Sequence, residues 1–239
     1  MKRKDGRGAK EPRKTKISHN IQEYAEGSVL IEVGSTKIIC AVSIENTVPI
    51  FLRSTGKGWI TAEYSMLPRS THTRTQRESN NRPKGRSQEI QRLIGRSLRA
   101  ITDLTMIGER TIYIDCDVLQ ADGGTRTAAI TGSYVALCKA FDKMLLEKNL
   151  EQNPLKSQLA AISVGIVQNN ILLDLCYEED SIAEVDMNIV MTNNHEIIEI
   201  QGTAEQSPFS INTANEMIEL ATSGVDYLVA IQNDALTNN

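Results

Sequence analysis

The fold is decided by residues 109–148, ERTIYIDCDVLQADGGTRTAAITGSYVALCKAFDKMLLEK. Residues 109–119 alternate apolar and polar side chains, which is typical of a strand with one buried face. The Asp-Gly-Gly run at 122–124 predicts a sharp turn, because glycine adopts backbone conformations that other residues avoid. Across 129–144, apolar residues recur every three or four positions, the spacing of one helix face. A strand, a tight turn and a long helix are therefore expected in direct succession.

The start of this helix has the chemistry of an oxyanion site. The first N–H groups of a helix are unpaired and carry partial positive charge, which favours a bound anion. Thr125 adds a hydroxyl donor next to Gly124, and Arg126 adds a planar guanidinium that matches a phosphate. The chain has neither Gly-Lys-Ser/Thr nor Gly-x-Gly-x-x-Gly at this turn. From spacing alone, the turn is either a phosphate site or an ordinary glycine turn that begins a helix.

The flanking sequence predicts hairpins. Residues 28–33 and 37–44 are rich in β-branched side chains, and Asn169-Asn170 joins a second pair of strand-like runs. Two more strands are expected over 184–192 and 196–202. Together these segments form the sheets against which the helices pack.

Two further helices are expected. Ser87 is the predicted N-cap of a helix with an apolar stripe from Ile90 to Ile101, and Gly224 is the predicted end of a closing helix. Strands in hairpins combined with helices on a sheet face indicate an α+β fold with mixed sheets. One domain over residues 1–239 is the simplest arrangement.

The net charge of -4 is divided unequally along the chain. Residues 1–99 hold 20 Lys and Arg against 9 Asp and Glu, whereas residues 100–239 hold 6 against 21. Such a basic half indicates a polyanion partner, unless the two halves neutralise each other in the fold or across an oligomer. Residues 1–16 carry eight of the basic side chains and predict a solvated basic arm.

A second basic segment is the loop 69–86, RSTHTRTQRESNNRPKGR, which has no apolar residue. Arg69, Arg74 and Arg77 are candidates to contact nucleic-acid phosphates, and the loop itself offers no aromatic platform for bases. Arg86 ends the loop and is a candidate second guanidinium for the anion at the glycine turn. The alternative for Arg86 is plain exposure to solvent.

Candidate acidic residues lie in CYEEDSIAEVDMN, residues 176–188. Asp180 is expected in the turn before a strand, and Glu184 and Asp186 share one face of that strand by period two. Two carboxylates near a phosphate hold Mg²⁺, or one of them acts as a general acid. The alternative is a solvated acidic turn.

Composition excludes several protein classes. No apolar run approaches the roughly 18 residues that a membrane span needs, and the N-terminus lacks the apolar core of a secretory signal. The four cysteines are far apart and form no Cys-x-x-Cys, which argues against a zinc ribbon or a disulfide scaffold and fits a reducing cytosol. A cytoplasmic protein without a membrane segment is expected.

Several blocks of the sequence resemble ribonuclease PH, and the resemblance extends from Asp5 to about residue 226. The blocks are 25–37, 58–78, 85–100, 115–132, 185–192 and 201–210. This family has a duplicated-looking βαβ fold, also known from a ribosomal protein domain, and assembles as a hexameric ring, a trimer of dimers. The resemblance therefore implies that fold and a homo-hexamer.

The resemblance also implies an activity. Ribonuclease PH is a tRNA nucleotidyltransferase, a phosphorolytic 3′→5′ exoribonuclease that trims precursor tRNA and other RNA 3′ ends. It uses inorganic phosphate as co-substrate and releases nucleoside diphosphates. The matching residues are Arg86, Gly124, Thr125 and Arg126 for phosphate, Asp180 and Asp186 for catalysis and Mg²⁺, and Arg69, Arg74 and Arg77 for RNA or the subunit interface.

Two alternatives belong to other classes. A non-catalytic RNA-binding ring subunit is expected to lack the site arginines or aspartates, all of which are present here. A metal-dependent hydrolytic nuclease is expected to carry denser carboxylate or histidine motifs. The departures from the family pattern are Lys4 and the run Pro12-Arg13-Lys14 in the N-terminal arm, and Asn193 and Gln206 in place of common glycines. None of them falls on the residues implied to bind phosphate.

Overall fold

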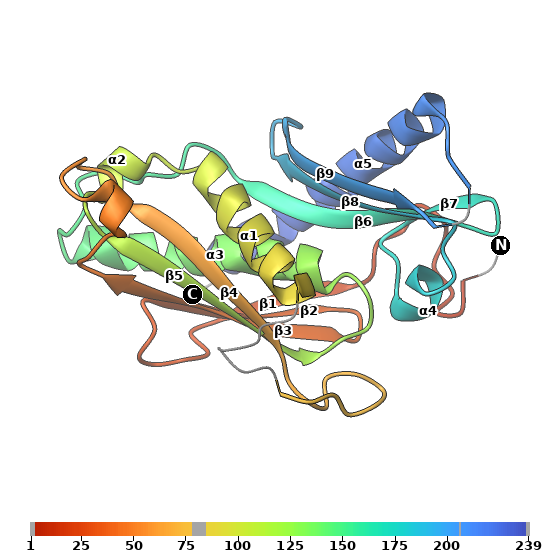
Figure 1. Ribbon diagram of the computed structural model, residues 1–239, viewed down its shortest axis with the longest axis horizontal. Coiled ribbons are helices and arrows are strands. Elements are labelled where there is room, and N and C mark those ends of the chain that lie inside the picture. Colours follow the sequence, from red (N-terminus) through yellow and green to blue (C-terminus); the bar gives the residue numbers. More distant parts are fainter. Residues whose placement is uncertain (1–2, 78–84, 206, 238–239) are drawn as a thin grey trace.

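The strands form two sheets within the residues that the computed structural model describes, 3–77, 85–205 and 207–237 (Figure 1). The strands are β1 Thr15–His19, β2 Gly27–Val33, β3 Thr36–Glu45, β4 Trp59–Met66, β5 Thr111–Gln120, β6 Leu159–Val167, β7 Asn170–Leu173, β8 Val185–Thr192 and β9 Ile197–Ala204. The helices are η1 Ile50–Leu52, α1 Gly85–Ala100, α2 Leu104–Ile107, α3 Thr125–Leu146, α4 Tyr177–Asp180 and α5 Ile211–Thr237. The predicted α+β class is confirmed.

The first sheet has the strand order β1-β2-β3-β5-β4. The predicted hairpin is β2 and β3, which pair antiparallel, and β5 pairs antiparallel with β3. By contrast, β4 runs parallel to β5, and α1 lies in the connection between them. The second sheet, β7-β6-β8-β9, is antiparallel throughout, so the prediction of mixed sheets holds for the first sheet only.

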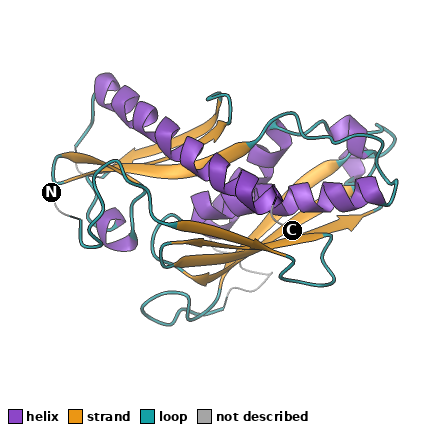
Figure 2. Ribbon diagram, turned by 180° about the vertical axis from the view of Figure 1, so that it is seen from behind, coloured by secondary structure: helices purple, strands orange, loops and turns teal. Residues whose placement is uncertain are grey.

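The central element is α3, which packs against β2 and β3 of the first sheet and β6 of the second. Figure 2 shows α3 and α5 as the two long helices of the molecule. The spacing of apolar residues predicts one buried face, but α3 is buried nearly all round because the second sheet covers its other side. Leu159, Ala161 and Val190 of that sheet belong to the same hydrophobic core as the first sheet.

The closing helix, α5, covers the other face of the second sheet. Met217, Ala221 and Val225 pack there in a core with Ile189 of β8. The prediction that Gly224 ends this helix is wrong, because α5 continues to Thr237. A Cβ at Gly224 would lie 2.4 Å from Ile162 Cδ1, so the glycine permits close packing of helix on sheet.

The start of α1 also differs from the prediction. The helix begins at Gly85, so Ser87 is inside the first turn and is not its N-cap. Ser87 is buried on the same side as Ile90 and Ile94, which places it on the core face. Arg86 is therefore a helical residue and not the end of a loop.

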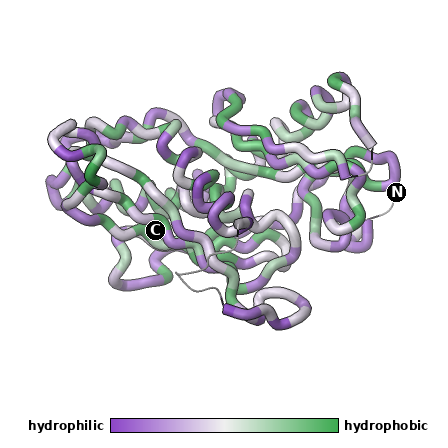
Figure 3. Tube along the Cα trace, viewed as in Figure 1, coloured by the Kyte–Doolittle hydropathy of each residue, from purple (hydrophilic) through white to green (hydrophobic). Residues whose placement is uncertain are grey.

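Hydropathy follows this arrangement. In Figure 3 the strands and helices contain long hydrophobic stretches, whereas the loop after β4 is mostly hydrophilic to neutral. Within the described part of the chain, no helix is both long and apolar enough to cross a membrane. The predicted loop over 69–86 is described only up to residue 77, and its part at 78–84 lies outside the described residues.

Candidate active site

The glycine turn between β5 and α3 is tightly enclosed. Gly123 and Gly124 both have a positive φ, +72° and +61°. A Cβ at Gly123 would lie 2.6 Å from the Leu175 carbonyl oxygen, and one at Gly124 would lie 2.7 Å from Arg13 Nη2. The turn therefore needs glycine for its conformation and for the close approach of its neighbours.

The residues after the turn present donors at the start of α3. Tyr64 of β4 donates its hydroxyl hydrogen to Thr125 Oγ1 over 2.8 Å, which leaves the proton of the buried Thr125 hydroxyl available for a ligand. Arg126 Nη1 donates to Gln201 Oε1 at 2.9 Å and to Glu89 Oε1 at 3.3 Å. These bonds orient Arg126, and the ion pair with Glu89 is partly exposed.

A second guanidinium comes from the first turn of α1. Arg86 is exposed, and no hydrogen bond or ion pair ties it to the part of the chain that the structure describes. Burial raises the pKa of both Asp180 and Asp186, and the charge of Arg86, like that of Arg126, opposes this rise. The structure therefore brings both predicted phosphate arginines to the two predicted carboxylates.

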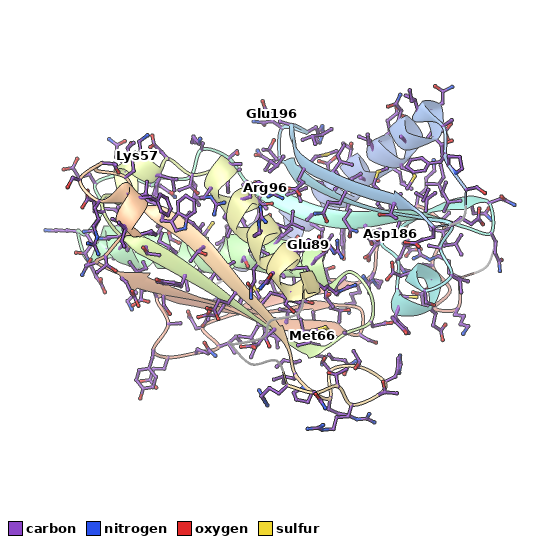
Figure 4. All side chains as sticks on the ribbon, in the orientation of Figure 1. Lys57, Met66, Glu89, Arg96, Asp186 and Glu196 are labelled. Carbon is purple, nitrogen blue, oxygen red and sulfur yellow. The ribbon has the colours of Figure 1, made fainter. Side chains whose placement is uncertain are left out.

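The carboxylates come from two elements of the second half. Asp180 is the last residue of α4, and Asp186 is the second residue of β8. Figure 4 shows Asp186 on β8 together with Glu89 on α1. The alternation of β8 turns Met187 and Ile189 toward α5, so that Asp186 and Asn188 lie on the face toward α3. Glu184 accepts a hydrogen bond from the Asn169 N–H, which leaves Asp186 as the partner of Asp180.

Both site carboxyls hold their protons more tightly than usual. Burial, and after it the charge of Asp180, raises the pKa of Asp186 to about 6. The charge of Arg126 and a hydrogen bond from the Asn188 amide to Oδ2, at 3.1 Å, oppose this rise. Loss of hydration also raises the pKa of the Asp180 carboxyl, although its side chain reaches solvent and three arginines oppose the shift. Two carboxyls with raised pKa values beside guanidinium groups are typical of functional sites.

The donor set fits Mg²⁺. This ion is commonly held by one or two carboxylates together with substrate phosphates and water, and Asp180 and Asp186 are close enough for their charges to interact. Over 3–77, 85–205 and 207–237, no group of three or more His, Cys, Asp and Glu side chains forms a metal cage. The two aspartates would therefore bind the ion jointly with a phosphate ligand.

The N-terminal segment forms the predicted solvated arm only in part. Its described lysines, Lys4, Lys10, Lys14 and Lys16, are exposed as predicted.

The arginines of this segment are buried instead. Arg3 is 2% exposed and donates from Nε and Nη2 to both carboxylate oxygens of Glu179, at 2.7 and 2.6 Å. Arg13 is 4% exposed and donates to both carboxylate oxygens of Asp174 in the same bidentate way. For Arg3 and Arg13 the prediction is wrong because acidic side chains distant in sequence neutralise them inside the fold.

The basic loop remains at the surface, as its composition predicts. Arg69, Arg74 and Arg77 are exposed, and Arg69 donates to the His72 carbonyl at 2.8 Å within the loop. Arg77 lies close enough to Asp117 to lower its pKa, although burial outweighs this and leaves that pKa raised. None of the three bonds to the carboxylates of the site in the described structure.

An aromatic pair adjoins the loop. The ring of His72 lies 5.5 Å from that of Tyr177, centroid to centroid, and the exposed Tyr177 opens the helix that ends at Asp180. The loop alone offers no base platform, but a residue from another element supplies one.

Sequence reasoning missed the residues that orient the site. These are Tyr64, Asn188 and Gln201, which contact Thr125, Asp186 and Arg126, together with Arg13 at the glycine turn. The alternation of β8 places Asn188 on the same face as Asp186, so Asn188 could have been predicted from the sequence. The others depend on pairings between elements far apart in the chain.

Solved structures share this fold. The rice (Oryza sativa) Rrp46 structure superposes with a TM-score of 0.80 at 20% identity, covering 98% of this chain and 100% of that one. The Archaeoglobus fulgidus exosome with RNA bound to the active site gives a TM-score of 0.81 at 22% identity over 96% and 92% of the two chains. An archaeal exosome core gives 0.78 at 21% identity over 97% and 91%.

Family models match both halves of the sequence. The model described as 3′ exoribonuclease family, domain 1, matches residues 11–141, which contain the whole first sheet and α3 as far as Phe141. The model of domain 2 matches residues 157–224, which contain the second sheet and both site aspartates. This chain belongs to the 3′ exoribonuclease family.

Proposed function

We propose that the protein is a phosphorolytic 3′→5′ exoribonuclease that shortens RNA with inorganic phosphate and releases nucleoside diphosphates. The observation that carries this proposal is the meeting of Arg86 and Arg126 with the donor-rich start of α3 and the carboxylate pair Asp180 and Asp186. Neither arginine forms an ion pair with these two aspartates in the described structure. Guanidinium groups and helix N–H groups bind phosphate, and carboxylates near phosphate serve metal or proton transfer.

The chain itself supplies binding and orientation of the attacking phosphate. Arg86 and Arg126 would neutralise the anion, and the Thr125 hydroxyl with the first N–H groups of α3 would fix its rotation. A phosphate oxygen then bonds to the phosphorus of the terminal phosphodiester as the bond from that phosphorus to the ribose 3′-oxygen breaks. The products are a nucleoside diphosphate and an RNA one nucleotide shorter, whose 3′-oxygen takes up a proton.

The carboxylates would act on the leaving oxygen. Asp180 and Asp186 would hold Mg²⁺, which when bound supplies positive charge for the oxygen that departs. Asn188 keeps the Asp186 carboxylate turned toward this position by its hydrogen bond to Oδ2. Electrostatic positioning of this kind accounts for most of the catalysis in other phosphoryl transfers, and no covalent intermediate is needed.

RNA would approach along the basic loop. Arg69 and Arg74 are exposed there, and the pair His72 and Tyr177 offers rings for stacking near the 3′ end. We assign precursor tRNA and other RNA 3′ ends as substrates, and a homo-hexameric ring, a trimer of dimers, as the assembly. The ribonuclease PH-like blocks of the sequence support both assignments, and the four free thiols suit a cytoplasmic enzyme.

The alternative is a non-catalytic RNA-binding ring subunit. The fold is shared with exosome subunits, and this likeness is compatible with either role. The presence of all four charged site residues, with raised pKa values at both aspartates, favours the enzyme.

The test is RNA shortening with and without inorganic phosphate. A 5′-labelled RNA should shorten by single nucleotides only when phosphate is present, and nucleoside diphosphates should accumulate. Monophosphates released without phosphate would show hydrolysis instead. Tight RNA binding without either product would identify the non-catalytic subunit.

A further inference from the structure

The N-terminal segment reaches the glycine turn through Arg13. Arg13 Nη1 donates to the carbonyl oxygens of Asp122 and Gly123, the latter at 3.5 Å. Its Nη2 occupies the space that a side chain at Gly124 would need, since a Cβ there would lie only 2.7 Å away. One guanidinium thus covers the turn from which α3 begins.

Asp174 fixes this guanidinium. Its Oδ2 accepts hydrogen bonds from the backbone N–H and Nε of Arg13, at 2.7 and 2.9 Å, and its Oδ1 accepts from Nη2 at 2.6 Å. Burial alone would raise the pKa of Asp174, but the charge and hydrogen bonds of Arg13 outweigh it and lower that pKa. Both side chains are almost fully buried, so the guanidinium is held in one orientation.

The turn is held on a second side by Thr36. Its hydroxyl donates to the Gly123 carbonyl at 2.8 Å and accepts from the Asp122 N–H at 2.9 Å. In a trans peptide the carbonyl and the N–H of the same unit point in opposite directions. Fixing the carbonyls of Asp122 and Gly123 therefore fixes the N–H groups of Gly123 and Gly124 on the other side of the backbone.

We infer that Arg13, oriented by Asp174, is a positioning residue that aims the glycine turn and the start of α3 at the bound phosphate. The inference rests on the proposed phosphate site at Thr125 and Arg126. The Arg13 guanidinium is committed to Asp174 and to backbone carbonyls, so it acts through the turn and does not bind phosphate itself.

The test compares Arg13→Lys with Arg110→Lys. Lysine keeps the charge, but its single ammonium group cannot form the bidentate hydrogen bonds to Asp174 and also donate to the carbonyls of the turn. Arg110 is a matched control, because it also donates to a backbone carbonyl, that of Ile107 at 2.7 Å, beyond the opposite end of β5. Inorganic phosphate is the probe, measured by equilibrium binding to the full chain without RNA.

Arg13→Lys should weaken phosphate binding about tenfold, the loss of one charge-assisted contact, whereas Arg110→Lys should leave it unchanged. With RNA saturating, the KM for phosphate should rise by the same factor in Arg13→Lys, and the Kd for RNA should not change. If Arg13 had only a structural role, Arg13→Lys would lower the folded fraction and the apparent kcat but would leave the Kd and the KM for phosphate unchanged.

Equal phosphate affinity in folded Arg13→Lys and wild type would overturn the inference. If Arg13→Lys does not fold, Asp174→Asn provides the second variant, because it retains an oxygen acceptor for Arg13, and it should weaken phosphate binding about threefold. Unchanged phosphate affinity in Asp174→Asn would also overturn the inference. Failure of the proposed function is a separate result: wild-type protein would bind phosphate yet release no nucleoside diphosphate.

Discussion

Two clusters of arginines and carboxylates adjoin each other in this protein, since Glu179 of one and Asp180 of the other are consecutive residues of α4. In the closed cluster, Arg3, Arg7 and Arg13 meet Asp174 and Glu179, and these side chains are nearly all buried. In the open cluster, Arg86 and Arg126 face Asp180 and Asp186 without bonding to them in the described structure. Both clusters combine arginines with carboxylates, but they differ in pairing and in burial.

The two clusters shift the pKa of their carboxyls in opposite directions. Burial favours the protonated form in both, but direct hydrogen bonds from Arg13 and Arg3 lower the pKa of Asp174 and Glu179. Asp180 and Asp186 lack such partners, and their pKa values are raised. The closed cluster therefore stabilises the fold, whereas the open cluster keeps charge free for a phosphate and a metal ion.

The largest effect is expected from Asp180→Asn in the open cluster. The change removes a metal ligand or proton donor without adding bulk, so the single-turnover rate should fall by about 10²- to 10⁴-fold. RNA affinity should stay close to that of the wild type. A normal rate with weakened RNA binding would make Asp180 a binding group and would break the comparison.

The pH profile separates the two roles of the aspartates. If the ionised Asp186 binds Mg²⁺, the wild-type rate should fall as the pH drops through about 6, the pKa of that carboxyl. Because the charge of Asp180 raises this pKa, Asp180→Asn should move the remaining profile to lower pH. A rate that falls as the pH rises above about 6 would instead assign a general acid.

The closed cluster should show its largest effect in stability. Asp174→Asn removes the charge that pairs with the buried Arg13, and breaking a buried pair costs about 3–5 kcal/mol in the free energy of unfolding. The exposed Arg74→Ala should change this free energy by less than about 0.5 kcal/mol. Urea unfolding of both variants measures the contrast, and equal losses would contradict it.

The stability lost in Asp174→Asn should depend on pH. The folded-state pKa of Asp174 is lower than its unfolded value of about 3.9, so its stabilisation is complete above that value. It is lost as the pH falls through the folded-state pKa. Wild type and Asp174→Asn should therefore converge in acid, and a constant difference down to low pH would show that charge is not its source.

Arg126→Ala tests the phosphate side of the open cluster. Loss of one charged contact should weaken phosphate use by about 1.5–3 kcal/mol, seen as a higher KM for phosphate. Stability should change little, since the ion pair with Glu89 is partly exposed and spans 3.3 Å. An unchanged KM would remove Arg126 from the site.

The smallest effect is expected from the loop. Replacing Arg69, Arg74 and Arg77 with alanine should flatten the log–log salt dependence of RNA binding by about 2, at roughly 0.7 for each RNA phosphate that is no longer neutralised. RNAs of different sequence should weaken alike. Sedimentation provides the control, because smaller particles would indicate an assembly role, and intact rings with an unchanged slope would leave these arginines without either role.

Local chemistry made the open cluster predictable from sequence. A strand, two glycines and Thr125-Arg126 form one continuous segment, so the turn and the start of α3 follow from short-range rules. The alternation of β8 narrowed the second carboxylate to Glu184 or Asp186, and the resemblance to ribonuclease PH selected Asp186. The closed cluster was not predictable, because Arg3 and Glu179 are joined only by the fold, and a basic run has the same composition whether its partners are distant carboxylates or water.

The helix ends show the same limit. Gly224 is a reasonable stop signal in isolation, but its contact with Ile162 of the second sheet gives it a packing role that no local rule contains. Tyr64 and Gln201 escaped notice for the same reason, since each reaches the site from another strand.

The most direct test of the central claim is to follow ¹⁸O from labelled inorganic phosphate during RNA shortening. If phosphate held by the open cluster attacks the terminal phosphodiester, the oxygens of the labelled phosphate should appear in the released nucleoside diphosphate. Arg126→Ala should release less labelled nucleoside diphosphate, in proportion to its lower activity, whereas Arg110→Lys should release as much as the wild type. Release of unlabelled monophosphate, or no release at all, would contradict the account.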